Sequence, residues 1–285
     1  MMCMRILAHT GLHKSASTNL QHLLHGHQDA LLARRIYYDS DNDFAAHHRV
    51  AWSLLAGDVG PCDRLLLRAA AQGTDYVIIS SEDLEGVLFD AGAARRLQES
   101  AARAGASLEW HMVLRDPGTY FVSLFAQLQC HVYADALTMF ADIMNKGGLY
   151  MHDPAPNWGG TPFWYYSFDH LRDLNRFAEE TGDRIVVYDY RDDRPFPGWR
   201  ILERIGALDL IGSMPGEAGQ NRRHSAEVVL DGYRARIAEA GGASLQHHVD
   251  AAVAASTASL DECARLISER FGDSHAQALA AFGPD

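Results

Sequence analysis

The chain has 285 residues, 47% hydrophobic and 22% charged, which is enough to bury a sizeable core. Its formal net charge of -12 disfavours a nucleic-acid-binding protein and a broad groove for polyanions. No apolar run has the length of a membrane span, no segment has the pattern of a signal peptide, and the four cysteines form no Cys-x-x-Cys pair. We therefore expect a single cytoplasmic domain, residues 1–285, with reduced thiols, and no integral membrane protein.

The first predicted element is a buried strand at 6–8, followed by a turn and by a helix with leucines at helical spacing. The turn contains Gly11, Lys14 and three hydroxyl side chains. Backbone N–H groups of such a turn, with about half a positive charge at the helix N-terminus, attract an anion. The pattern predicts a phosphate-binding turn. The alternative is that Ser and Thr only cap the helix.

The turn differs from the loop that binds nucleoside triphosphates. That loop has Gly directly before the Lys, whereas His13 precedes Lys14 here, and only two residues separate Gly11 from the Lys. The acidic metal ligand expected at the end of a later strand is not evident either. These departures disfavour ATP with Mg²⁺.

The rest of the chain alternates strand and helix signals. This pattern predicts an α/β fold with a central parallel sheet flanked by helices. Strands are expected at 36–38, 76–79, 108–114 and 184–190. Helices are expected at 50–55, 64–71, 91–104, 120–140, 166–181 and 199–205, and along the alanine-rich C-terminal region. A connection at 39–49, a long aromatic loop at 147–163 and a polar loop at 212–225 complete the prediction.

Polar residues follow three of the predicted strands. They are Lys14 with its turn, Ser81 with Glu82, and Arg115. Ligands of open α/β sheets bind beyond the carboxyl ends of the strands, so these clusters are expected along one edge. The fifteen histidines, including His22 and His25 on one helix, lack a completing Cys or carboxylate at zinc spacing. We predict no metal site.

Two of these clusters resemble the sulfotransferases that use 3′-phosphoadenosine 5′-phosphosulfate, especially bacterial members. Lys14-Ser-Ala-Ser-Thr18 is similar to the family's turn for the 5′-phosphosulfate. Arg115-Asp-Pro117, with Ser123 eight residues after the Arg, is similar to its 3′-phosphate motif. The chain has Ala16 where the family commonly has Gly, which is tolerable if this position is already helical.

The resemblance implies a P-loop-like sulfotransferase fold and a set of donor-binding residues. Lys14 would stabilise the leaving phosphate, and Arg115 with Ser123 would hold the 3′-phosphate. Arg222 and Arg223 lie in the late loop, where the family closes a basic segment over the nucleotide. The full implied set is Lys14, Ser15, Ala16, Ser17, Thr18, Asn19, Arg115, Ser123, Arg222 and Arg223.

The catalytic base is narrowed to a few candidates. Glu82 is preferred because the resemblance places a base at the end of this strand, although a Glu there also serves as a turn cap. His48 is the second candidate, and Asp41 and Asp43 are weaker ones. Tyr190 either faces the adenine or is a buried strand residue.

The expected reaction is transfer of a sulfuryl group to an acceptor hydroxyl, giving adenosine 3′,5′-bisphosphate. Aromatic residues at 147–163 favour a carbohydrate or glycoconjugate acceptor, with phenols or lipids next, or else they form a local core. The alternatives are a P-loop-type small-molecule kinase using ATP and Mg²⁺, and a nucleotide-binding module without activity.

Overall fold

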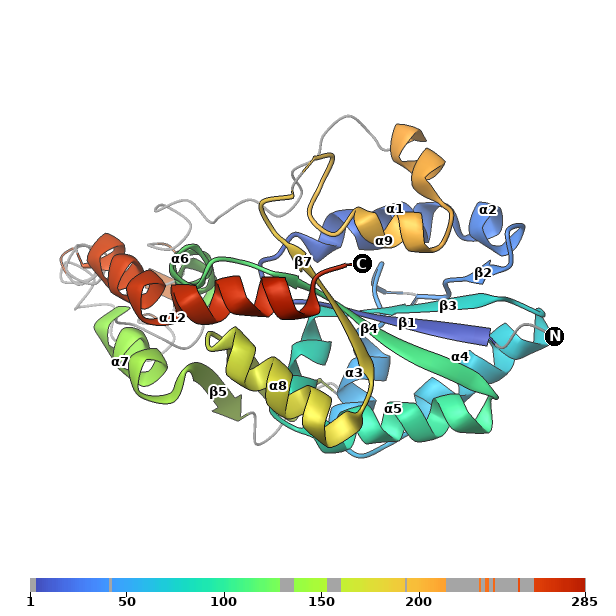
Figure 1. The fold of residues 1–285 in the computed structure, drawn as a ribbon, viewed down its shortest axis with the longest axis horizontal. Coiled ribbons are helices and arrows are strands. Elements are labelled where there is room, and N and C mark those ends of the chain that lie inside the picture. The colour runs from blue at the N-terminus through green and yellow to red at the C-terminus, as the bar shows by residue number, and fades with distance from the viewer. Residues whose placement is uncertain are drawn as a thin grey trace.

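The fold is built around a five-stranded parallel sheet, shown as a ribbon in Figure 1. The computed structural model describes residues 4–40, 43–128, 136–152, 160–192, 194–213 and 259–284, with positions 231, 234, 235, 238 and 251. In spatial order the strands are β2 (Ile36–Tyr37), β3 (Tyr76–Ser80), β1 (Met4–Gly11), β4 (Ala106–Leu114) and β7 (Arg184–Asp189). The predicted α/β class with a central parallel sheet is therefore confirmed.

Helices cover both faces of the sheet (Figure 1). One face carries α1 (Ser17–Gly26), α2 (Gln28–Leu32) and α9 (Arg200–Arg204). The other carries α3 (His48–Leu55), α4 (Gly60–Ala71), α5 (Ala91–Arg103), α6 (Pro117–Leu128), α8 (His170–Thr181) and α12 (Leu260–Phe282). Helix α7 (Ala136–Lys146) packs against α12, beyond the sheet. Two 3₁₀ segments, η1 (Glu82–Leu88) and η2 (Leu208–Ser213), complete the described helical elements. None of the described helices is long and apolar enough to cross a membrane.

The central strand shows why both faces are covered. Ile6 and Ala8 of β1 pack into the core under α3–α8, whereas Leu7 packs into the core under α1 and α9. All three side chains are fully buried. Such a continuous apolar run is typical of a parallel strand buried on both sides.

Two predicted elements differ from the structure. The stretch expected as a long loop contains β5 (Gly148–His152) and β6 (Phe163–Ser167), which form an antiparallel pair. Its glycines and prolines suggested a loop, but aromatic residues favour strands when they pair across a hairpin. Tyr166 consequently lies in β6 rather than in a helix, and α8 begins four residues later.

The buried carboxylate of Asp173 fixes this hairpin to α8. It accepts hydrogen bonds from Tyr165 Oη at 2.6 Å and from Ser167 Oγ at 2.8 Å. Because the acceptor is charged, these bonds are stronger than neutral ones.

The helix predicted at 120–140 corresponds to α6 and α7 in the structure. Residues 129–135 between them lie outside the described part of the chain.

Helices α6 and α12 pack at very close range. A Cβ added to Gly118 of α6 would overlap the carbonyl oxygen of Ala264 and Ser268 Oγ, both on α12. Ser268 Oγ also donates to Asp116 Oδ1, 3.2 Å away, just before α6. The absence of a side chain at Gly118 thus sets the spacing of the two helices.

We predict that Gly118→Ala lowers the free energy of unfolding by about 1–3 kcal/mol, because overpacking must push α12 outward. Gly272→Ala on α12 is the matched control. Its new methyl group meets nothing within 4 Å, so helix propensity alone should raise stability by up to about 1 kcal/mol. Urea unfolding of both variants provides the measurement, and equal effects would contradict this account of the packing.

Candidate functional site

The carboxyl ends of β1, β3 and β4 lie next to one another, as the sequence predicts. His9 of β1 is in register with Ser80 of β3, and Gly11 with Val113 of β4. The N–H of Ser81 also donates to the carbonyl oxygen of His9 at 3.1 Å. The three polar clusters that follow these strands therefore meet at one edge of the sheet.

The first cluster is the lysine turn, residues 12–16, between β1 and α1. A Cβ on Gly11 would lie 2.7 Å from Ser15 Oγ and 2.9 Å from Ser17 Cβ, closer than real Cβ contacts. Ser15 donates from both its N–H and its Oγ to the carbonyl oxygen of Leu12, at 3.0 and 2.5 Å. The turn therefore folds back tightly on the end of the strand, and only glycine fits at position 11.

Two residues of the lysine turn have left-handed backbone conformations. Lys14 and Ala16 both have φ of 61°, and α1 begins directly afterwards at Ser17. Ala16 is therefore not helical, and the picture of a position that tolerates Ala without strain is wrong. Alternation of left-handed residues in a turn creates concavities lined by backbone N–H groups, which bind anions.

The residues of this region that were predicted to bind the phosphosulfate nucleotide fall into a buried group and a half-buried group. Ser15 and Ser17 are almost completely buried, and Ser17 Oγ donates to Glu82 Oε2 at 3.2 Å. Both hydroxyls make hydrogen bonds within the protein, and their role as phosphate ligands stays a prediction. In the turn and at the start of α1, the half-buried members of the implied set, which a ligand can reach, are Lys14, Ala16, Thr18 and Asn19.

Arg115, the polar residue that follows β4, contacts the lysine turn. Its Nη1 donates to the carbonyl oxygen of Lys14 at 2.9 Å, which fixes the guanidinium against the lysine turn. Its Cζ lies 4.6 Å from the ring centre of Tyr190, a cation–π arrangement. Tyr190 is half-buried and follows the end of β7. It is thus not the buried strand residue considered as one alternative.

A hydroxyl at the start of α6 lies beside Arg115. Thr119 Oγ1 lies 3.3 Å from Arg115 Nε. Ser123 follows four residues later on the same side of α6, and it is 7% exposed. The structure therefore places the Thr119 hydroxyl beside the guanidinium, and the role of Ser123 at the 3′-phosphate stays a prediction.

The charges around Lys14 act in opposite directions. Burial lowers the pKa of the Lys14 ammonium; the Glu82 carboxylate opposes this shift and the nearby Arg115 adds to it. Glu82 also accepts from Gln21 Nε2 at 3.4 Å, in addition to its bond from Ser17. The preferred base candidate is thus tied to α1 and lies near the lysine.

A buried ionic cluster, which the sequence analysis did not predict, lies beside the lysine turn. His13 Nδ1 is 2.9 Å from Glu85 Oε2, and His13 Nε2 is 3.2 Å from Asp83 Oδ1. Burial lowers the pKa of His13, but the hydrogen bonds and charges of these carboxylates outweigh it and raise the pKa to about 10. The imidazole is therefore a cation held between two anions.

Both carboxylates of this cluster have further donors. Glu85 is fully buried and accepts from Tyr120 Oη at 3.2 Å and from the N–H of Ser167 at 2.7 Å. Burial opposes ionisation of Asp83, but hydrogen bonds from His13 and from His48 hold its pKa well below the usual range. The pattern in the sequence that could have indicated this buried cluster is the acidic run Glu82-Asp-Leu-Glu85 after a buried strand, together with a histidine directly before the lysine.

His48 is at the partly exposed end of the cluster, with 17% of its side chain exposed. Its Nδ1 lies 2.9 Å from Asp83 Oδ2 and 3.0 Å from Ser81 Oγ. The ring stacks on Trp52, whose Nε1 donates to the same carboxylate oxygen at 2.6 Å. Burial lowers the pKa of His48, but Asp83 and Glu82 outweigh burial and the opposing charge of His13, so the pKa is raised overall.

Of the remaining predicted residues, the structure places only Asp43. Asp43 is exposed and pairs with Arg49. Asp41, Arg222 and Arg223 fall outside the described residues. Within the described ranges, no three His, Cys, Asp or Glu side chains are grouped as ligands of a metal ion would be.

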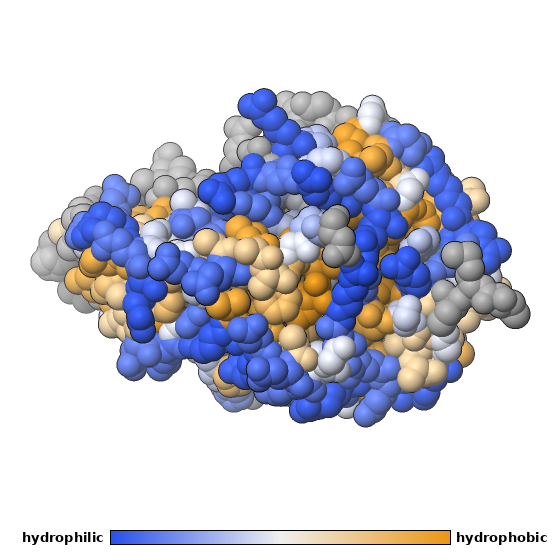
Figure 2. All heavy atoms as spheres, in the orientation of Figure 1, coloured by the Kyte–Doolittle hydropathy of each residue, from blue (hydrophilic) through white to orange (hydrophobic). Residues whose placement is uncertain are grey.

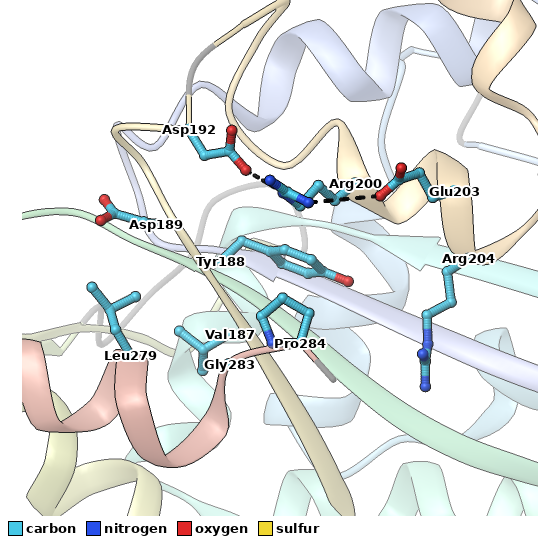
Figure 3. A pocket seen from close by; sticks show the side chains of 10 residues that line it. All are labelled: Val187, Tyr188, Asp189, Asp192, Arg200, Glu203, Arg204, Leu279, Gly283 and Pro284. Carbon is cyan, nitrogen blue, oxygen red and sulfur yellow. Dashed lines mark hydrogen bonds and ion pairs between the residues drawn. The ribbon is translucent and has the colours of Figure 1, made fainter.

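A separate hollow of about 610 Å³ lies at the free edge of β7 (Figure 3). Residues of β7, α9 and the end of α12 line it, including Tyr188, Arg200 and Leu279. Arg200 pairs with Asp192 and Glu203 along one side of this hollow. Its lining includes neither Lys14 nor Arg115, so it is not the candidate site.

Comparisons of the chain with protein-family models, curated proteins and solved structures found no match. Function is therefore inferred from the residues of the site and their geometry.

We predict that Ala16→Gly raises the free energy of unfolding by up to about 1 kcal/mol. The left-handed conformation costs an L-residue roughly 1–2 kcal/mol, part of which is offset by the larger freedom of glycine when unfolded. Ala102→Gly, at an exposed position of α5, is the control and should be destabilising by about 0.5–1 kcal/mol. Chemical denaturation measures both, and destabilisation by Ala16→Gly would contradict the left-handed turn.

Proposed function

We propose that the protein is a sulfotransferase that moves a sulfuryl group from 3′-phosphoadenosine 5′-phosphosulfate to an acceptor hydroxyl. The observation that carries this proposal is the hydrogen bond from Arg115 to the Lys14 carbonyl. It holds two cationic side chains, which follow adjacent strands, at one edge of the sheet. A donor with phosphate at two separate positions needs two neighbouring anion sites.

The lysine turn provides the first anion site in this proposal. The Lys14 ammonium stabilises charge on the leaving phosphate, while Thr18, Asn19 and the adjacent backbone N–H groups surround the 5′-phosphate. Such a transfer depends mainly on positioning and charge stabilisation, as phosphoryl transfer does.

Arg115 and the start of α6 provide the second site. The guanidinium is held by the cation–π contact with Tyr190 and offers a planar set of donors to the 3′-phosphate. The Thr119 hydroxyl lies beside it, and the helix N-terminus adds positive potential. This second site would distinguish the bisphosphate nucleotide from ATP.

The finer features of the proposal follow from the same assignment. We assign the fold to the P-loop-like sulfotransferases, with β1, the lysine turn and α1 as the phosphate-binding unit. Cys62 and Cys263 are free and buried, which supports a reducing, cytoplasmic location.

The acceptor is proposed to be a carbohydrate or glycoconjugate. Exposed Phe89 and Tyr150 have ring centres 4.6 Å apart and extend an aromatic group that includes Phe163 and Tyr165. Flat apolar rings next to polar groups are suited to stacking on an acceptor ring. Glu82 and His48 are the two candidates for the base that takes the hydroxyl proton.

We predict that adenosine 3′,5′-bisphosphate stabilises the protein selectively. At about one hundred times its Kd, the ligand should add about 2.7 kcal/mol and raise the Tm by several degrees. ATP with Mg²⁺ at the same concentration should have a much smaller effect. Thermal denaturation compares the two, and a preference for ATP with Mg²⁺ would instead support the kinase.

We predict that Lys14→Ala lowers sulfuryl transfer from labelled donor by about 100-fold or more, because a preorganised charge on the leaving group is lost. Lys146→Ala, which removes the other lysine of the chain from a surface ion pair on α7, should leave turnover unchanged.

Arg115→Lys should weaken binding of the bisphosphate and reduce the preference for the bisphosphate over ATP, since the planar donor set is lost. Unchanged bisphosphate binding in Arg115→Lys would remove the second anion site from the proposal.

A further inference from the structure

The two ring nitrogens of His48 have different surroundings. Nδ1 faces the ionised carboxylate of Asp83. In the neutral ring Nδ1 therefore carries the proton, and its N–H donates a hydrogen bond to Asp83. The neutral ring then has its lone pair on Nε2. The side chain is partly exposed, and the charge of Glu82 at the sheet edge acts on it.

Asp83 is held from three directions. His13 Nε2 approaches one oxygen, while His48 Nδ1 and Trp52 Nε1 approach the other. The stacked indole of Trp52 fixes the plane of the His48 ring as well as the carboxylate. This arrangement determines which nitrogen of His48 is protonated and where the other one points.

His13 cannot serve as a proton acceptor in this cluster. Both of its ring nitrogens face carboxylate oxygens, so each needs a proton to make its contact. Glu85, behind it, is fully buried and accepts from Tyr120 and Ser167 in addition. The positive charge of His13 therefore compensates two buried anions.

We propose that His48 and Asp83 form a histidine–carboxylate pair in which His48 takes the proton of the acceptor hydroxyl, while His13 stays positively charged behind Asp83 as a positioning residue. The pair deepens the proposed function and rests on it for the reaction. Oε2 of Glu82, in contrast, accepts hydrogen bonds from Ser17 and Gln21, and the carboxylate offsets the charge of Lys14.

The proton balance of the step is simple. The acceptor oxygen forms its bond to sulfur as the bond between sulfur and the phosphate oxygen breaks. The phosphate oxygen keeps the electron pair of the broken bond and lies beside Lys14. The hydroxyl proton moves to His48 Nε2, giving an imidazolium stabilised by Asp83. The groups that face His48 and set its charge are Asp83, Glu82 and His13.

NMR titration of histidine-labelled protein tests the pair directly. We expect His48 to titrate above the ordinary histidine pKa of about 6.5, and His13 to keep both ring protons up to about pH 9. Asp83→Asn should lower the pKa of His48 by about one unit or more, because the attracting charge is lost.

A double variant separates the role of His13 from folding. His13→Gln with Glu85→Gln removes a buried cation and a buried anion together, so no unpaired charge remains. Asp83 then has no second cation, and the pKa of His48 should rise. His22→Gln is the control and should leave it unchanged. An unmoved His48 pKa in Asp83→Asn, or a neutral His13 near pH 7, would overturn the proposal.

Kinetics then connect the pair to turnover. His48→Gln should remove the acid limb of the pH–rate profile of donor turnover, whereas Glu82→Gln should retain it; the reverse result would return the base to Glu82. Different results would contradict the sulfotransferase function and the His48–Asp83 pair. If the bisphosphate does not bind but His48 titrates as expected, the sulfotransferase assignment is lost and the pair stands. If it binds but Asp83→Asn leaves His48 unmoved, the pair is wrong.

Discussion

The buried ion cluster around His13 is the contact on which the geometry of the site depends. His13 comes directly before Lys14, and its carboxylate partners lie 70 and 72 residues further along the chain, after the neighbouring strand. Main-chain register alone aligns β1 with β3, but this cluster fixes the lysine turn against η1. Removing one partner would strand an uncompensated buried charge, at about 3–5 kcal/mol. Such a loss is a large share of the stability of an ordinary domain.

Carboxylates alternate with basic side chains from this cluster to the surface. The order is Glu85, His13, Asp83, His48, Glu82, Lys14, with Arg115 beside the last. Each carboxylate has a cationic neighbour, so the edge of the sheet holds several ionised groups despite the low dielectric of the interior. The two cations at the outer end, Lys14 and Arg115, are held together by the hydrogen bond from the guanidinium to the Lys14 carbonyl oxygen. An acidic protein can therefore present a local cationic site.

The amino-acid pattern predicts the parts of this site that depend on local signals. Apolar runs locate the strands, and the polar residues after them locate Lys14, Glu82 and Arg115. The His13–Glu85 contact depends on strand register across 72 residues, which no local pattern encodes. The inward rotation of the Ser15 and Ser17 hydroxyls depends on two left-handed residues, a conformation that L-amino acids rarely adopt. The hairpin β5–β6 was obscured because its aromatic strands are bordered by glycine and proline.

The hollow beside β7 has a consequence for solubility. β7 is an outer strand, and in the described chain its sole strand partner is β4, so one row of its main-chain donors and acceptors faces outward. Walls from α9 and from the last residues of α12 flank that row, and charged side chains such as Arg200 and Asp192 surround it. Figure 2 shows hydrophilic residues around a more apolar centre on this face. A strand of another molecule would have to enter between these walls, so the recess protects the protein against edge-to-edge aggregation.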